Sequence, residues 1–313
     1  MKVKSSLVVA LVVVVAIFLI LQLASKRAEE DKPLFPQFRP EKAARIAIDG
    51  KDRRTVLEKQ GEVWIVTSED SFPAEASAVE RIFDEIGKFS RKDVVSTNPS
   101  KHAVYNVDTT GTAVTIEDRD GDTLAAFVVG KVGPDYQSTY VRNVLTDEVI
   151  LSPSYLPPVF ERGGRTWQNL AIFDYEPFDI QKIHIDRPSE KVTLVRDSGG
   201  SWYISEPESL ACDTDRVSRL VRTLAYLKGE EIAGRAPVEG SGLAEPDSSV
   251  WFELSNGKQE KLIFGDITDR KRIYTKAEPG NIVYLVASYK VNAIMPKLKH
   301  LRAKETEEQE KGS

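Results

Sequence analysis

The chain has 313 residues, of which 41% are hydrophobic and 29% charged, with a formal net charge of -5 and one cysteine. This composition excludes a disordered chain, and the length allows about two domains of roughly 100–200 residues each. The acidic balance, without a basic stripe interleaved with aromatic residues, argues against nucleic acid as a partner.

The first predicted element is a transmembrane helix over Ser5–Ala24, within an anchor of residues 1–27. Its only strongly polar side chain is Gln22, and about 20 residues at a rise of 1.5 Å span about 30 Å, the hydrocarbon thickness of a bilayer. The alternative is a cleaved signal peptide, whose apolar region would be shorter and would end in a small-x-small cleavage site. The sequence "LQLAS" fits such a site poorly. We therefore expect an uncleaved anchor.

The orientation of this anchor is less sharply encoded. Lys2 and Lys4 precede the apolar run, while Lys26 and Arg27 follow it, so the positive-inside count is nearly balanced. A very short N-terminal tail before a long polar region favours export of that region, and a single cysteine without a disulfide partner is compatible with export. We expect a single-pass protein of the cytoplasmic membrane with the bulk of the chain extracytoplasmic, in the periplasm. A cytosolic location stays open.

Two segments rich in charged residues lie on either side of the globular part of the chain. The stretch "AEEDKPLFPQFRP" predicts an extended linker over residues 28–42 that separates the globular part from the membrane. The charged residues 303–313 predict a disordered tail.

The globular part repeats itself. Trp64 and Trp202 are 138 positions apart, and at this spacing the apolar positions of one helical stretch match those of another: Val79, Ile82 and Ile86 with Val217, Leu220 and Leu224. Further matches pair "ARIAIDG" with "QKIHIDR", and "GTAVTIEDRDGDTLAAFVVG" with "DSSVWFELSNGKQEKLIFG".

Each copy therefore predicts two strands, a helix, several antiparallel strands and a closing helical turn, which is an α+β fold. The predicted domains are residues 43–167 and 178–302, joined by a linker of residues 168–177. A period this long that occurs twice indicates a duplicated domain rather than a solenoid.

Two residue patterns suggest metal binding at first sight. The stretch Glu117–Asp122 alternates acidic residues, but its glycine comes too early for a calcium loop and Val129 stands where a bidentate Glu is needed. The second copy has Asn256-Gly257 here, a two-residue hairpin signal, so we expect a hairpin. The three histidines, His102, His184 and His300, lack the spacing of zinc ligands.

The candidates for nucleophilic catalysis are equally isolated. Cys212 stands before a predicted helix start but has no Cys-His signature, and its counterpart is Ala74, so a small buried residue is favoured. Serine-nucleophile and phosphate-loop motifs do not occur in the sequence. Trp64 and Trp202 recur in both copies, which favours a place in the core. We predict no catalytic, cofactor-binding or metal-binding residue, no cofactor and no enzymatic activity.

The repeated phrases "VWIVTSEDSFPAEASAVERIFDEI" and "SWYISEPESLACDTDRVSRLVRTL", with "TYVR…EVIL" and "IYTK…IVYL", resemble the bacterial domain-of-unknown-function family numbered 4340. The resemblance covers nearly everything after the linker, together with the anchor. Members are often encoded beside gliding-motility-type ABC transporter permeases and the auxiliary membrane protein of that system. The resemblance thus implies an envelope-facing accessory role, with such a permease or auxiliary subunit as a partner, and it supplies no catalytic residues.

Three functional hypotheses follow. The first is a non-enzymatic accessory protein of the envelope that binds a protein or polymer. The second is an envelope hydrolase or carbohydrate-binding protein with a site between the two repeats, for which Asp213, Asp215, Arg142 and Lys276 would have to converge. The third is a structural spacer that tolerates surface substitutions in both copies.

Overall fold

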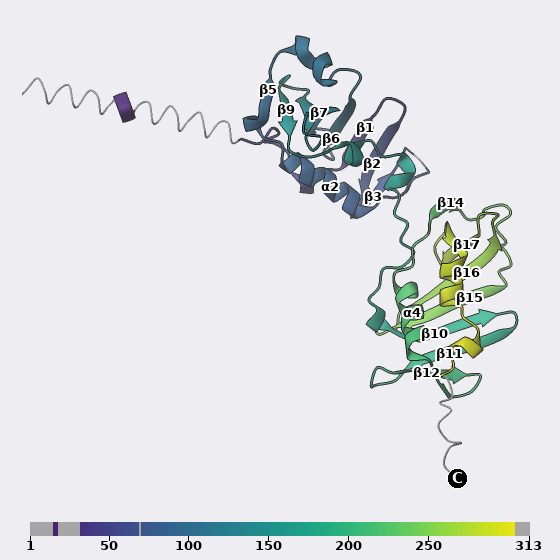
Figure 1. Ribbon diagram of the computed structural model, residues 1–313. Helices are drawn as coiled ribbons and strands as arrows, with labels where there is room; N and C mark the ends of the chain where they lie inside the picture. The colour runs from purple at the N-terminus through teal and green to yellow at the C-terminus, as the bar shows by residue number, and fades with distance from the viewer. Residues whose placement is uncertain (1–14, 18–31, 69, 304–313) are drawn as a thin grey trace, which may run out of the picture. The chain divides into compact units, whose positions relative to one another are not determined.

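The computed structural model describes residues 15–17, 32–68 and 70–303. These fall into two compact units that divide between Asn169 and Leu170, and each unit contains one nine-stranded antiparallel sheet with a few helices (Figure 1). The predicted α+β class with a duplicated domain is therefore correct. Within the described residues no helix is long and apolar enough to cross a membrane, and the anchor predicted over Ser5–Ala24 lies outside them except for residues 15–17.

The strands of the first unit are β1 Arg45–Asp49, β2 Arg54–Gln60, β3 Val63–Val66, β4 Phe72–Pro73, β5 Val94–Ser96, β6 Thr112–Glu117, β7 Thr123–Val132, β8 Thr139–Asn143 and β9 Val149–Ser152. Its helices are α2 Ala76–Gly87 and α3 Pro157–Phe160, with the 3-10 turns η1 Pro40–Lys42, η2 Arg91–Asp93, η3 Pro99–Tyr105 and η4 Gly164–Trp167.

The strands of the second unit are β10 Ile180–Arg187, β11 Glu190–Arg196, β12 Trp202–Glu206, β13 Leu210–Ala211, β14 Glu231–Arg235, β15 Ser248–Leu254, β16 Gln259–Ile267, β17 Arg272–Glu278 and β18 Ile282–Ala287. Its helices are α4 Thr214–Ala225, α5 Ser288–Ile294 and α6 Leu298–Leu301, with the 3-10 turn η5 Pro177–Asp179.

The two sheets have the same topology. The first runs β4-β3-β2-β1-β6-β7-β8-β9-β5, and the second runs β13-β12-β11-β10-β15-β16-β17-β18-β14. The register is also shared: Ile46 pairs with Leu57 in the first unit, and Ile183 pairs with Leu194 in the second. In both units the strand after the main helix, β5 or β14, lies at the far edge of the sheet. The repeat therefore includes a strand order that departs from the order in the sequence.

The main helix of each unit buries the apolar face that the sequence predicts. In α2, Val79, Ile82 and Ile86 join strand residues such as Ile46 in one core cluster. In α4, the three equivalent residues are also buried. Apolar side chains that recur every three or four residues place one stripe of a helix against a sheet, which explains this packing.

The segment before each first strand belongs to the repeated unit. The amide of Leu34 donates to the carbonyl of Phe89 at 2.9 Å, and the amide of Ile172, 138 positions later, donates to the carbonyl of Leu227 at 2.8 Å. Phe35 is buried against Phe89 and Phe127. We call residues 33–38 and 171–176 the lead-in segments.

This packing differs from the linkers predicted over residues 28–42 and 168–177. Residues 28–31 lie outside the described residues, while residues 32–42 are ordered against the first unit. Prolines hold the backbone extended, which suits a linker but equally suits a segment that pairs at an edge. The buried aromatic side chain decides between the two, since it anchors the segment in the core.

The end of each unit closes onto the start of its main helix. The amide of Glu75 donates to the carbonyl of Trp167 at 2.7 Å, and the amide of Asp213 donates to the carbonyl of Leu301 at 2.8 Å. Trp167 and Leu301 are both fully buried. Residues 168 and 169, expected in the linker, thus pair with the first unit through Ala74 and Pro73.

A recurring glycine lets a loop cross each sheet closely. A Cβ on Gly130 would lie 2.3 Å from the carbonyl oxygen of Tyr105, and one on Gly265 would lie 1.9 Å from that of Ser241. The next loop residue, Asn106 or Gly242, has a positive φ in both units. The matching "FVVG" and "LIFG" endings are therefore required by backbone contact.

We predict that Phe35→Ala destabilises the first unit by about 3–5 kcal/mol, because it removes a buried ring from the core. A linker residue would have no such effect. Urea unfolding followed by far-UV circular dichroism measures the change. Val95→Ala, at a side chain that is 45% exposed, is the control and should change the free energy by less than about 0.5 kcal/mol. Equal stability of Phe35→Ala and the wild type would contradict the packing role.

Candidate functional site

The structure places Cys212 in a structural position. It is buried at the bridge with Arg302, and its thiol donates to the carbonyl oxygen of Trp202 at 2.8 Å. Burial raises the pKa of this thiol, which disfavours the reactive thiolate. Ala74 makes the equivalent bridge, to Gln168, in the first unit. The predicted small buried residue is therefore what the structure shows.

The acidic stretch Glu117–Asp122 forms the turn between β6 and β7. The carboxylate of Asp118 accepts hydrogen bonds from the amides of Asp120 and Asp122 at 3.0 and 2.9 Å, and Gly121 has a positive φ. The hairpin interpretation is confirmed, because the carboxylate satisfies the turn itself. Within residues 32–68 and 70–303 no group of three or more His, Cys, Asp or Glu side chains is placed to hold a metal ion.

The histidines are separately engaged. His184 lies 2.7 Å from the hydroxyl of Thr193 and stacks on Trp251, with the ring centroids 5.4 Å apart. His102 lies near Asp147, with a nitrogen–oxygen distance of 3.8 Å, whereas His300 belongs to the short helix α6.

Three of the four charged residues named for a site between the repeats have local partners. Arg142, in the first unit, donates to the carbonyl of Val107 at 2.7 Å. In the second unit, Asp213 caps α4 by accepting from the amide of Arg216 at 3.0 Å, while Lys276 pairs with Glu278 at 3.5 Å. Asp215 lies in the exposed first turn of α4.

The two recurring tryptophans do not share one environment. Trp64 is 9% exposed and lies in the first core, as predicted. Trp202 is only partly buried and lines a hollow of the surface. The core role predicted for Trp202 is thus only half correct, because Phe83, which packs against Trp64, is replaced by Val221 in the second unit.

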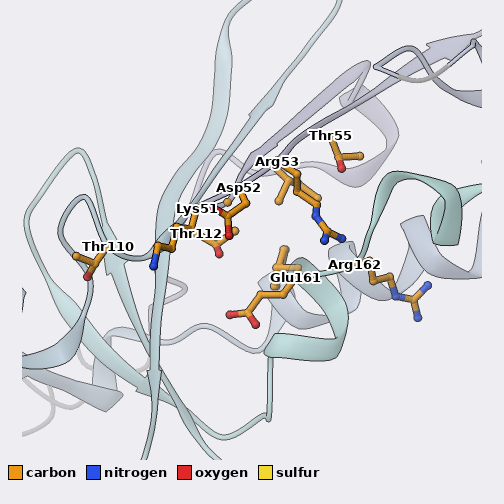
Figure 2. Close-up of a pocket in the computed structure, with 11 residues that line it drawn as sticks. Lys51, Asp52, Arg53, Thr55, Thr110, Thr112, Glu161 and Arg162 are labelled. Atoms are coloured by element: carbon orange, nitrogen blue, oxygen red, sulfur yellow. The ribbon is translucent and has the colours of Figure 1, made fainter.

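A charged hollow of about 260 Å³ lies at one end of the first sheet (Figure 2). Three segments meet there: the β1–β2 turn, the start of β6 and the end of α3. The turn is closed by the amide of Gly50, which donates to the carbonyl of Arg53 at 2.9 Å, and it presents Lys51, Asp52 and Arg53 to solvent. We call this the first hollow.

The floor of the first hollow is buried and its rim is charged. Thr55 and Phe160 are 1% exposed at the floor, whereas Lys51, Asp52, Arg53 and Glu161 are exposed. Figure 2 shows the side chains of Asp52, Arg53 and Glu161 directed into the space between the turn and α3. Within the described part of the chain, the guanidinium of Arg53 has no hydrogen bond or ion pair. The rim thus offers charges of both signs over a preformed floor.

The second unit has a hollow at the equivalent end, of about 340 Å³. It lies among Arg187 at the end of β10, the start of β15 and the end of α5. Its charges differ: Glu245, Asp247 and Asp266 line it, and the guanidinium of Arg187 donates to the carbonyl of Met295. The two hollows share a place in the fold but not a chemistry.

Sequence reasoning did not find either hollow. Each assembles a turn, a strand start and a helix end that are separated by more than 40 positions, and nothing in a single repeat marks these segments as neighbours. The only available signal is the charged turn "DGKDRR" at Asp49–Arg54, which differs from its counterpart "DRPSEK".

We predict that Cys212→Ala changes the unfolding free energy by less than about 1.5 kcal/mol, because alanine occupies the same position in the first unit. We also expect the native thiol to react with a thiol reagent far more slowly than the urea-unfolded chain, because burial holds it protonated. The reaction is followed by absorbance in both states. A native thiol as reactive as the unfolded one would contradict the structural role.

A protein-family model matches most of the chain. The model described as "Domain of unknown function (DUF4340)" matches residues 64–246 and again residues 202–313. No match was found among curated proteins or among solved structures. Two overlapping matches that together span residues 64–313 agree with the two sheets, and the chain therefore belongs to the DUF4340 family.

Proposed function

We propose that the chain is a membrane-anchored, non-enzymatic accessory protein of the cell envelope that acts by binding a protein or polymer. In this proposal the repeats lie outside the cytoplasmic membrane. The protein is an auxiliary component of an ABC-type transport system of the gliding-motility kind.

One observation carries the proposal: a single scaffold, built twice, presents different chemistry at the same place. The first hollow has Lys51, Arg53 and Arg162 beside two acidic residues, whereas the equivalent hollow has Arg187 beside three. An unchanged scaffold with altered rims is typical of modules that contact different partner surfaces.

The chemistry of the first hollow suits recognition of a charged surface. Exposed arginine and lysine side chains can meet complementary charges on a partner. Such complementary charges raise the association rate and select the partner. Arginine is also enriched at the centre of protein interfaces.

The residues that an enzyme would use have other partners. Cys212 bonds Trp202, Asp213 caps α4, and Arg142 bonds Val107. These contacts support a binding role over the hydrolase, whose site between the repeats stays a prediction.

The test is co-purification of the full-length chain from detergent-solubilised membranes at native expression. We predict recovery of an ABC permease, its auxiliary membrane protein or an envelope polymer. Arg53→Glu should lower this recovery at least about tenfold, because it reverses a charge in the first hollow. Arg119→Glu, the same change in the exposed β6–β7 turn, should leave it unchanged. Recovery of no transporter or envelope component would contradict the proposal.

A further inference from the structure

A second hollow surface, of about 510 Å³, occurs in the second unit and is lined by apolar and basic side chains. Trp202 and Val221 contribute from β12 and α4, and Pro177 and Phe178 contribute from the turn before β10. Phe178 is 62% exposed and lines the same surface as Trp202, Val221 and Pro177, so these side chains form a contiguous apolar patch. We call this surface the Trp202 groove.

The first unit shows what covers a tryptophan at this position. Phe83 on α2 packs against Trp64, with ring centroids 6.0 Å apart, and Phe38 packs against Phe83 at 5.8 Å. Phe38 comes from the lead-in segment. The scaffold thus accommodates an aromatic side chain, delivered by an extended stretch of chain, beside the main helix.

The second unit lacks both rings. Val221 stands at the position of Phe83. The stretch from Phe173 to Pro177 is one residue shorter than the stretch from Phe35 to Pro40. Tyr175 turns to Glu260, to which its hydroxyl donates at 2.5 Å, and Glu176 accepts from the hydroxyl of Tyr226 at 3.1 Å. The groove remains open because these two residues are held elsewhere.

The backbone at Phe178 is held in place although the Phe178 ring is exposed. The carbonyl of Phe178 accepts from Arg196 and from Gln181, each at 2.7 Å, and Arg196 also donates to the carbonyl of Gly200 at 3.1 Å. The ring of Phe178 is therefore displayed from a turn that two donors hold in place. A preformed surface of this kind loses little conformational entropy on binding.

The charge of this surface is reversed between the units. The first unit has Glu41, Glu62, Glu80 and Asp84 at the positions that carry Phe178, Gly200, Ser218 and Arg222 in the second. Within the described residues the guanidinium of Arg222 forms no hydrogen bond or ion pair, and it is exposed. Four carboxylates are thus replaced by an aromatic residue, two small residues and an arginine.

We infer that the Trp202 groove binds an extended polypeptide segment of a partner protein that carries an aromatic side chain next to a carboxylate. The aromatic ring occupies the place beside Trp202 that Phe83 and Phe38 fill in the first unit, and the carboxylate pairs with Arg222. Tryptophan and arginine are the side chains that most often dominate binding energy in such interfaces. The inference deepens the proposed function and rests on it for the biological setting of the partner.

The probe is the acetylated hexapeptide PLFPQF, which copies residues 33–38 and ends in a free carboxylate beside its last phenylalanine. It is titrated into the full-length chain in detergent and followed by isothermal titration calorimetry. We expect a dissociation constant of about 1 mM or below, and no binding of the same peptide with alanine in the last position.

Substitutions locate the site. Trp202→Ala removes the platform, Val221→Phe fills the groove as in the first unit, and Arg222→Glu reverses the exposed charge. Each should weaken binding at least about tenfold, a factor that corresponds to about 1.4 kcal/mol. Arg219→Glu is the matched control, since it makes the same charge change on an exposed position of α4 outside the groove, and it should bind as the wild type does. Thermal unfolding of each variant verifies the fold. If Val221→Phe does not fold, Arg222→Glu, at an exposed position, still tests the site.

Three results would overturn the inference. They are no binding by the wild type up to about 5 mM peptide, equal binding by wild type and Trp202→Ala, and binding of chitotriose but not the peptide in a Trp202-dependent manner. The last would assign the groove to a glycan. None of these alters the co-purification result, so failure of this inference and failure of the proposed function are distinguishable.

Discussion

Each unit depends on the pairing of its lead-in segment with the end of its main helix. The hydrogen bonds of Leu34 to Phe89 and of Ile172 to Leu227 fix where the helix ends and where the first strand begins. A buried phenylalanine, Phe35 or Phe173, then fills the core beneath the pairing. Because the last helical turn closes onto the start of the same helix, both ends of the chain in each unit are tied to one element. The surfaces beside this element can change without loss of the fold.

Much of this scaffold was predictable from the sequence. The alternation in "ARIAIDG" and "QKIHIDR" and the helical spacing of Val79, Ile82 and Ile86 follow from the periods of strands and helices. The packing of the lead-in segments was not predictable, because prolines and charges are also typical of linkers. The buried ring of Phe35 is what anchors the first of these segments in the core. The partial exposure of Trp202 was missed for a different reason. It depends on whether residues distant in sequence, such as Phe83 and Val221, cover the tryptophan.

The duplication separates residues that the fold requires from residues that it does not require. Gly130 and Gly265 recur because a loop crosses the sheet at both positions, and Ala74 and Cys212 recur as small buried residues. The surfaces at Arg53 and Trp202 do not recur. The first has a mixed rim, where its counterpart is mainly acidic; the second is aromatic and basic, where the first unit is acidic. These differences, rather than any feature common to both copies, support a binding role with more than one contact surface.

The scaffold and the place of binding are tested most directly by amide hydrogen exchange on the full-length chain, compared between native membranes and the purified protein. We predict that the amides of Leu34 and Ile172 exchange slowly in both states, because they open only when their own unit unfolds. We also expect extra protection in membranes confined to peptides that contain Lys51–Arg53, Phe178 or Trp202. Rapid exchange at Leu34 and Ile172 would contradict the scaffold. Extra protection spread equally over equivalent positions of both units, or absent from all of them, would contradict the claim that binding resides where the copies differ.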